Sequence, residues 1–148
     1  MTLENYIIGL NNIKNSLPNE VDKIVLKNEK LILGMLKFRL FNFGTDGNDD
    51  SLEGYSKKTI EIKKKNNQKY NITTLRDQGN FYAGMYLDST NGKILISSTA
   101  SQTSDLVNKY GEAIFDLTYK QQQDIISNVI DPELQNLLDS LGNIEIKL

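Results

Sequence analysis

Two short stretches hold residue types that do chemistry in other proteins. The first, 44–54, is rich in aspartate, asparagine and glycine, which suits a calcium-binding loop. Aligned on the EF-hand pattern from Asp46, however, it has Ser51 at the required glycine and Lys57 at the required bidentate glutamate. We therefore interpret 44–54 as a solvated loop that ends a helix, and we expect no metal.

The second stretch, 97–104, is rich in serine and threonine. A serine nucleophile needs a neighbouring base, but the chain has no histidine, and only Lys93 and Lys109 are close in sequence. We interpret 97–104 as a loop in which Ser101 or Ser104 caps the next helix. Cysteine is also absent, which excludes disulfides, Cys/His zinc sites and cysteine nucleophiles. We therefore expect no enzyme of a familiar nucleophilic or zinc class, and no cofactor.

The charge of the chain is segregated. The net charge is −2, yet residues 57–76 contain a basic cluster with Glu61 as its one acid: Lys57, Lys58, Lys63, Lys64, Lys65, Lys69 and Arg76. Such segregation suits a surface that meets an acidic protein or nucleic acid, and a solvated loop is the alternative. With two arginines in the chain, contact with DNA would be to phosphates and independent of base sequence.

A β-hairpin is the clearest element that could position these groups. From Phe81 to Leu87 the side chains alternate as in a half-buried strand, which places Tyr82 and Tyr86 opposite the apolar face. Asn91-Gly92 predicts the turn, although we expect a loop longer than two residues. Residues 93–97 then form the returning strand.

Helical spacing predicts long helices before and after the hairpin. A first helix ends at Pro18, and the main helix runs from Glu20 to about Phe43, with a second half that is apolar over most of its circumference. Thr118 and Gln121 form a capping box that opens a helix over 119–142.

Two segments allow alternative interpretations. Residues 55–63 form either a short helix or an edge strand. At Asp131-Pro132 the C-terminal helix is either kinked, which the apolar spacing favours, or divided into two helices in series. Residues 144–147 alternate like a short edge strand.

These elements predict an α+β fold, with long helices packed on a small antiparallel sheet built around the β-hairpin. The 148 residues fit a single domain with an N-terminal helical arm (1–18), a loop-rich basic insertion (44–72) and a kinked C-terminal helix (119–142). We expect no signal peptide and no membrane segment, because even the most apolar stretch, 31–43, is too short and carries charge.

Four stretches share their order and spacing with a known protein family. They are Leu31–Met35 leading into Asp46–Asn48, Tyr55–Thr59 followed by Lys63-Lys64, Thr74–Tyr82, and Lys109–Thr118. On these stretches the chain resembles small virion proteins of tailed bacteriophages and prophages of Bacteroidetes-type hosts, in the head-tail connector, neck and tail-completion group. It departs from the family pattern at Gln78, Asn80 and Asp116, where threonine, aspartate and glycine are usual.

The resemblance implies a structural subunit that is made in the host bacterial cytoplasm and assembles as a ring at the head-tail junction of the virion. Its expected partners are further copies of itself and portal, connector or tail proteins, with no membrane and no small-molecule substrate. We predict that neighbouring subunits contact Leu33, Leu36, Leu40, Phe41, Phe43, Tyr82 and Tyr86, with burial in a monomer core as the alternative.

The basic cluster has two corresponding interpretations. In a ring it would line a lumen that DNA passes through or touch an acidic portal or tail subunit. The alternative from another class is a cytoplasmic phage or mobile-element nucleic-acid-binding protein. Such a protein would use the lysine-rich segment 57–76, with Tyr55 and Tyr70 as stacking platforms for bases.

Overall fold

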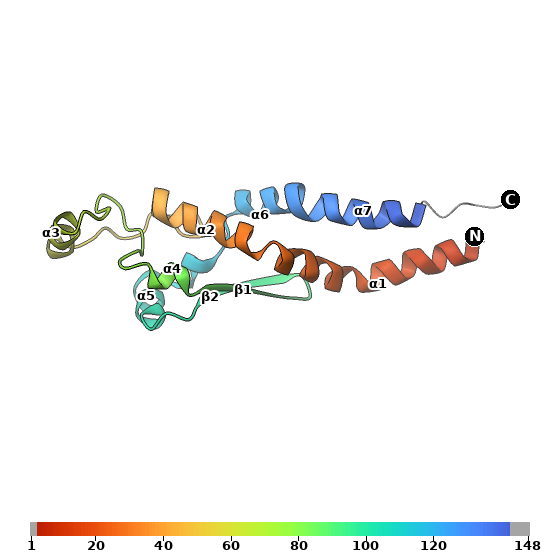
Figure 1. Cartoon of the computed structure of the whole chain (residues 1–148), viewed down its shortest axis with the longest axis horizontal. Coiled ribbons are helices and arrows are strands. Elements are labelled where there is room, and N and C mark those ends of the chain that lie inside the picture. The colour runs from red at the N-terminus through yellow and green to blue at the C-terminus, as the bar shows by residue number, and fades with distance from the viewer. Residues whose placement is uncertain (1–2, 143–148) are drawn as a thin grey trace. The chain divides into compact units, whose positions relative to one another are not determined.

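The computed structural model describes residues 3–142 of the protein. It is mostly helical, with one two-stranded antiparallel sheet (Figure 1), which confirms the predicted α+β class. The helices are α1 (Leu3–Lys27), α2 (Glu29–Phe43), α3 (Lys57–Lys65), α4 (Asn80–Ala83), α5 (Thr103–Tyr110), α6 (Tyr119–Ile125) and α7 (Asp131–Gly142). A 3₁₀ turn, η1 (Glu112–Phe115), and a π-helical turn, η2 (Ile126–Ile130), accompany them, and the strands are β1 (Met85–Thr90) and β2 (Lys93–Ser98). The strand expected at 144–147 lies outside the described residues.

The elements divide between two compact units. Unit 1 comprises the described parts of Met1–Asn28, Asp88–Leu95 and Gln123–Leu148, and unit 2 comprises Glu29–Leu87 and Ile96–Gln122. Each unit has buried apolar residues of its own. The assignment of the whole chain to one domain stays a prediction.

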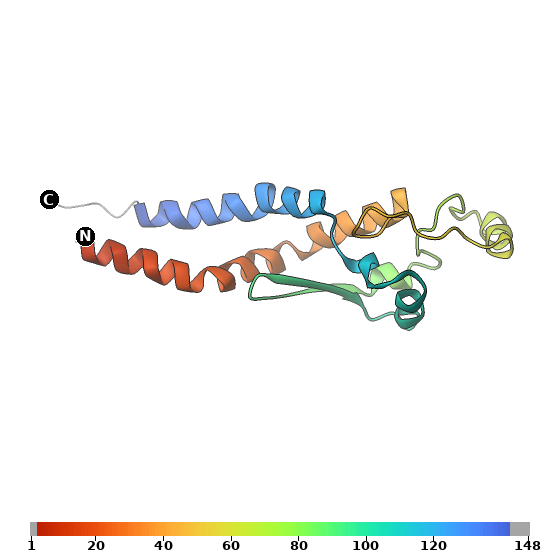
Figure 2. The ribbon, with the colours of Figure 1, turned by 180° about the vertical axis from the view of Figure 1, so that it is seen from behind.

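In unit 1, α1 and α7 pack on each other and run antiparallel (Figure 2). Lys27 Nζ lies 2.9 Å from Glu133 Oε1, which links the end of α1 to the start of α7. The buried apolar residues of this unit are Ile24, Val25, Ile125 and Val129. Most apolar residues in the first turns of α1 stay exposed, Leu3 and Ile8 among them.

The prediction that Pro18 ends the first helix is wrong, because α1 continues through it to Lys27. A proline inside a helix removes one backbone hydrogen bond, and packing can offset that cost. The helix ends instead at Asn28, whose side-chain amide donates to the carbonyl oxygen of Ile24 at 2.8 Å. The same carbonyl oxygen also accepts from the backbone N–H of Asn28 at 3.2 Å, so the side chain adds a second hydrogen bond at the helix end. The expected main helix over 20–43 is therefore divided there.

The capping box at the start of α6 is confirmed. Thr118 N–H donates to Gln121 Oε1 and Gln121 N–H donates to Thr118 Oγ1, each at 3.1 Å. The helical conformation then continues through the π-helical turn η2 into α7, without a break at Asp131-Pro132. Of the two alternatives, a single continuous helix over 119–142 is correct and two helices in series is wrong, while the expected kink stays a prediction.

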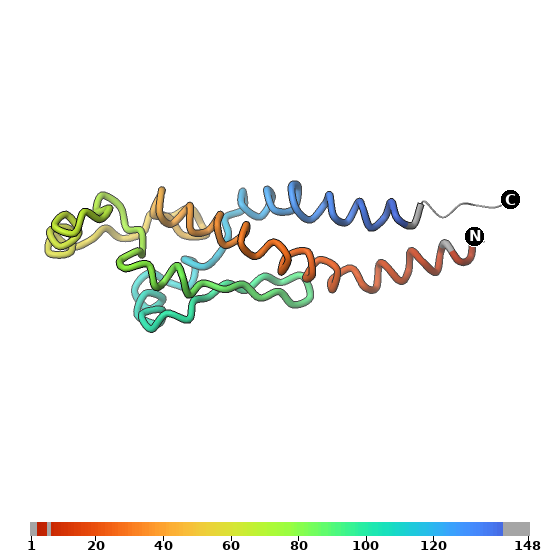
Figure 3. Tube along the Cα trace, in the orientation of Figure 1, coloured from red at the N-terminus to blue at the C-terminus, as the bar shows by residue number. Residues whose placement is uncertain are grey.

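In unit 2, the buried side of α2 packs against a core gathered from distant parts of the chain. Phe81 lies 5.5 Å from Phe115 between ring centroids, and Ile114 is fully buried. Between α2 and α4 the chain leads through α3 and returns to the core (Figure 3). Segment 55–63, left open between helix and strand, contains the start of α3, where Ser56 Oγ accepts from the backbone N–H of Thr59.

The hairpin forms as predicted, but its first strand begins later. Phe81 and Tyr82 belong to the short helix α4, not to the strand, and β1 starts at Met85. From there burial alternates strictly, so the predicted periodicity holds over β1 alone. The expectation of a loop longer than two residues is wrong, because β1 and β2 are joined by the two-residue turn Asn91-Gly92, with φ of 52° and 75° as a tight hairpin turn requires.

Candidate functional site

The helix α2 is apolar on two opposite sides. Its inner side is buried and consists of Ile32, Leu33, Leu36 and Leu40, with relative exposures of 5% or less. Its outer side carries Leu31 and Phe38, seven residues apart and therefore on one face, and Phe43 follows at the end of the helix. Leu31 is 51% exposed, and Phe38 and Phe43 are each 60% exposed. We call Leu31, Phe38 and Phe43 the outer α2 face.

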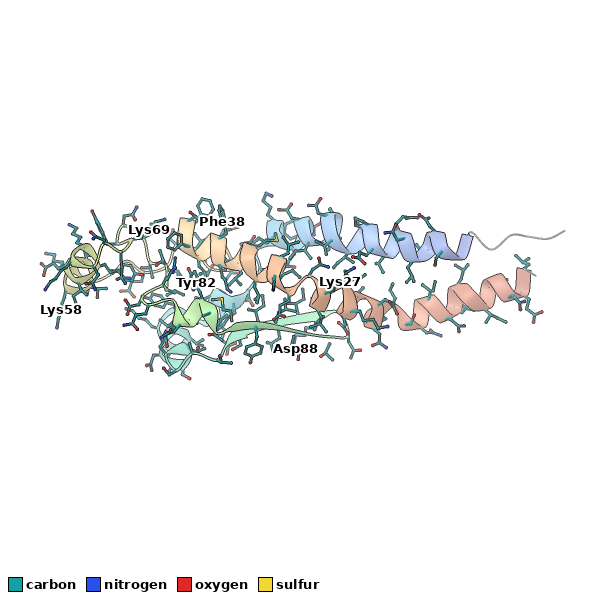
Figure 4. All side chains as sticks on the ribbon, viewed as in Figure 1. Lys27, Phe38, Lys58, Lys69, Tyr82 and Asp88 are labelled. Atoms are coloured by element: carbon teal, nitrogen blue, oxygen red, sulfur yellow. The ribbon has the colours of Figure 1, made fainter. Side chains whose placement is uncertain are left out.

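Within the outer α2 face, Phe38 and Phe43 form a pair. Their ring centroids are 5.9 Å apart in an edge-to-face arrangement. The side chain of Phe38 points away from the ribbon of α2 (Figure 4). Two large aromatic side chains that pack on each other and still face solvent form a contiguous apolar patch, which is typical of an interaction site.

The predicted contact residues on α2 therefore need correction. Leu33, Leu36 and Leu40 have almost no exposed surface, so they are core residues and cannot contact a neighbour. Phe41 is half-buried, and Lys69 Nζ and the guanidinium of Arg76 lie 5.0 and 5.4 Å from its ring centroid. Of the five predicted contact residues on α2, Phe43 alone is exposed.

Leu31 and Phe38 are contact candidates that the sequence interpretation missed. Their spacing is the same helical signal as that of the core residues. It indicates a shared face, but not whether that face is covered. A helix that is apolar all round does not reveal from sequence alone which of its sides the fold will bury.

The two predicted tyrosines differ. Tyr82 is half-buried in α4, and its hydroxyl donates to the carbonyl oxygen of Thr74. Burial raises its pKa well above the ordinary value, so the hydroxyl stays protonated as a donor. Tyr82 therefore supports the fold of unit 2, whereas Tyr86, 42% exposed on β1, remains available for a contact.

The basic cluster is built on a helix rather than the expected loop. Lys57, Lys58, Lys64 and Lys65 of α3 are exposed. Lys63 is buried instead, since its ammonium group donates to the carbonyl oxygen of Arg76 at 3.0 Å and lies 4.8 Å from the ring centroid of Tyr55. Lys63 is thus a structural residue and not part of the basic surface.

Two further members of the cluster help to hold unit 2 together. Lys69 Nζ donates to the carbonyl oxygen of Phe41 at 2.9 Å, which fastens the chain after α3 to the end of α2. Arg76 is exposed and lies near the same Phe41 ring. Of the seven residues in the predicted basic cluster, the exposed ones are therefore the four lysines Lys57, Lys58, Lys64 and Lys65 of α3 and Arg76.

Beside α3 there is a cleft of about 290 Å³. Its apolar lining includes Tyr55, Ile62, Leu75, Leu106 and Tyr110, and its polar lining includes Lys63, Gln68, Arg76 and Asp77. Gln68 Nε2 donates to Asp77 Oδ1 at 3.1 Å, while the buried Gln68 Oε1 has no donor among the described residues. The cleft is therefore an apolar hollow with cations along its wall, inside unit 2.

A buried arginine fixes the geometry of this unit. Arg39 is 4% exposed, and its guanidinium donates to the carbonyl oxygens of Thr45, Ile114 and Asp116 and to Gln121 Oε1. Burial lowers the pKa of Arg39, and the neighbouring carboxylates oppose that shift. These contacts join α2 to the 44–54 loop, to η1 and the residue after it, and to the capping box.

The 44–54 loop is stabilised by hydrogen bonds between its own residues. Asp46 Oδ1 accepts from the backbone N–H groups of Asn48 and Asp50, at 2.8 and 3.1 Å. Thr45 and Ser51 form an isolated antiparallel bridge. Within residues 3–142, no group of three or more potential ligands could hold a metal ion.

Comparison with known protein families, curated proteins and solved structures finds no match for this chain. In the part of the chain that the structure describes, no helix has both the length and the apolar character needed to cross a bilayer.

Proposed function

We propose that the protein is a structural subunit of a tailed-phage particle. In this proposal it acts at the head-tail interface, as a connector, neck or tail-completion ring, without catalysis. The observation that supports this most is the outer α2 face, where Phe38 and Phe43 are each 60% exposed. Exposed aromatic clusters of this kind are typical anchors of protein-protein interfaces.

A ring makes specific demands on each subunit. Closed rings use head-to-tail contacts, in which one face of a subunit meets a different face of its neighbour. The chain offers surfaces of distinct character: the apolar outer α2 face and the basic exposed side of α3. The family resemblance supplies the position at the head-tail junction, and the two surfaces are consistent with it.

The test is incorporation into particles. Purified virions of a phage that encodes the chain should contain it, detected by mass spectrometry and localised by cryo-electron microscopy at the neck. The double variant Phe38→Ser/Phe43→Ser should fold but be lost from the particles. Leu95→Ser is the matched control, since Leu95 is 58% exposed on β2 and lies outside the outer α2 face. Absence of the wild-type chain from virions would overturn the proposal.

One observation favours the second candidate, a free nucleic-acid-binding protein: the four exposed lysines of α3. The tyrosines proposed as stacking platforms fit less well, because Lys63 and Lys64 each lie 4.8 Å from a ring centroid, over Tyr55 and Tyr70 respectively. Light scattering of the isolated chain with duplex and single-stranded DNA separates the two functions. A salt-sensitive complex of one chain with DNA, together with absence from virions, would establish the second candidate.

A further inference from the structure

The exposed side of α3 combines positive charge with an apolar residue. Lys58, Ile62 and Lys65 are spaced by four and three residues, so they lie on one face of the helix. Ile62 is 51% exposed and also lines the cleft beside α3. Over residues 57–65 there are five lysines and one acid, Glu61. We call Lys58, Ile62 and Lys65 the α3 face.

The exposed side of α7 has the opposite character. Asp131, Leu138 and Asp139 are exposed, and Leu138 is separated from Asp131 by seven residues, which places both on one side of the helix. Residues 131–142 contain three acids and no lysine or arginine. One of those acids, Glu133, is paired with Lys27, whereas Asp139, next to the exposed leucine, accepts a hydrogen bond from Gln135 Nε2 at 2.9 Å. We call Asp131, Leu138 and Asp139 the α7 face.

From this complementarity we infer that the α3 face of one subunit docks on the α7 face of a second copy of the same chain. This inference rests on the proposed ring function and specifies which two surfaces meet. At 1.5 Å per residue, the lysines of the α3 face are about 10 Å apart along the helix and the aspartates of the α7 face about 12 Å. Flexible lysine side chains span that difference, so both charge pairs can form together.

The cleft gives the contact an apolar anchor. Ile62 is one of its lining residues, and cavities of about 150 Å³ already hold a benzene molecule, so 290 Å³ has room for the Leu138 side chain of a second copy. Its lining by Leu75, Leu106 and Tyr110 suits an aliphatic group. The contact is heterologous, because the α3 face of each subunit meets the α7 face of the next. Such a contact can be repeated from subunit to subunit around a ring.

The absence of cysteine makes cross-linking a direct test. In the full-length chain, the double variant Ile62→Cys/Leu138→Cys should yield a ladder of covalent multimers under mild oxidation. A mixture of the two single variants should yield mainly heterodimers. The control pair is Ile62→Cys/Leu95→Cys, which also places two exposed cysteines but outside the proposed contact. A ladder as strong from the control pair, or no ladder from the first pair, would overturn the inference.

Charge reversal tests the chemistry of the same contact. In the cysteine background, Lys58→Glu/Lys65→Glu and Asp131→Lys/Asp139→Lys should each lower the cross-linking yield by at least about tenfold, because like charges then face each other. Mixing the two reversed chains should restore the ladder, since each reversed face meets an opposite one. Circular dichroism of each variant verifies folding. Cross-linking that is insensitive to charge, or a shift of duplex DNA that is lost in Lys58→Glu/Lys65→Glu without any ladder, would refute the contact.

The outcomes for the inference and for the proposed function are separable. If the chain is found in virions but the charge-reversed mixture gives no multimers, this contact is wrong and the ring function stands. If the multimers form as expected but virions lack the chain, the self-contact is real and the head-tail role is wrong.

Discussion

Replacing Arg39 with methionine tests whether one buried cation organises unit 2. The guanidinium is 2.7 to 3.3 Å from its four acceptors: three backbone carbonyl oxygens and the side-chain oxygen of Gln121. Methionine fills a similar volume but donates no hydrogen bond. The carbonyl groups of Thr45, Ile114 and Asp116 would then lose this donor.

The expected loss of stability follows from opposing terms. Each buried acceptor left without a donor costs about 1–3 kcal/mol. Methionine avoids the desolvation of a charged group, which returns several kcal/mol. Removing one side of a buried charged network typically costs about 3–5 kcal/mol in total, and we expect Arg39→Met to lower the free energy of unfolding by that amount. Arg39→Lys should also destabilise, because one ammonium cannot reach acceptors that the guanidinium spans.

Urea denaturation followed by tyrosine fluorescence measures this change. The chain has no tryptophan, and six of its seven tyrosines lie in unit 2, so the signal reports mainly on that unit. Lys30→Met is the matched control, an exposed cation on the same helix, expected to change the free energy of unfolding by less than about 0.5 kcal/mol. A loss below about 1 kcal/mol for Arg39→Met would refute the assigned role of the guanidinium.

Three further changes test local structure. The Asp22 carboxylate accepts from the Ser89 hydroxyl and from the backbone N–H groups of the hairpin turn, which lowers its pKa below the ordinary 3.8. Because the pKa of this carboxyl group is lower in the folded chain than in the unfolded chain, the carboxylate stabilises the fold at pH values above the unfolded-state pKa, and that stabilisation is lost as the pH falls through the folded-state pKa. The stability difference between wild type and Asp22→Asn should therefore shrink under acid titration below about pH 4. Thr118→Ala removes one half of the capping box and should cost about 1 kcal/mol in thermal or urea unfolding. At Gly47 a Cβ would lie 2.4 Å from the Asp116 Cβ, so Gly47→Ala should destabilise by about 1–3 kcal/mol, whereas Gly34→Ala, in open space on α2, should stabilise by up to about 1 kcal/mol.

Signals that depend only on neighbouring residues could be predicted from the sequence. The Asn91-Gly92 turn needs positive φ at both positions, and these two residue types tolerate it best. The capping box depends on two side chains three residues apart, and the structure contains both of its hydrogen bonds. In each case the structure depends on residues that are at most three positions apart in the sequence.

Boundaries that depend on tertiary packing could not be predicted. Pro18 looks like a helix end because it removes a hydrogen bond, yet helix α1 continues across it. Phe81 looks like a strand residue because the alternation extends back to it, but packing against Phe115 places it in the short helix α4. Local periodicity did not indicate either outcome.

For the candidate surfaces too, local features could be predicted from the sequence, whereas burial that depends on tertiary contacts could not. The alternation of Ile60 and Ile62 with polar residues is a local feature, and it left helix and edge strand as the two expected forms of 55–63. The structure shows the helix, with Ser56 as its N-cap. The burial of Lys63 arises from a bond to Arg76, thirteen residues away, which exists only after folding. Likewise, the sequence identified α2 as too apolar for one-sided cover, but the choice of Phe38 over Leu36 as the exposed residue was made by the core of unit 2.

The exposed apolar area of the outer α2 face limits the free energy that this surface can contribute to an assembly. Large aromatic side chains bury about 150–250 Å² each, so 60% exposure leaves roughly 250 Å² on Phe38 and Phe43 together. At about 25 cal/mol per Å², covering that area contributes about 6 kcal/mol at most. Association costs about 4–15 kcal/mol in lost translational and rotational freedom, so over most of that range this apolar patch alone does not hold subunits together. In the proposed ring, the docking of the α3 face on the α7 face would supply further stabilisation, so charge reversal on either of these two faces should weaken the assembly.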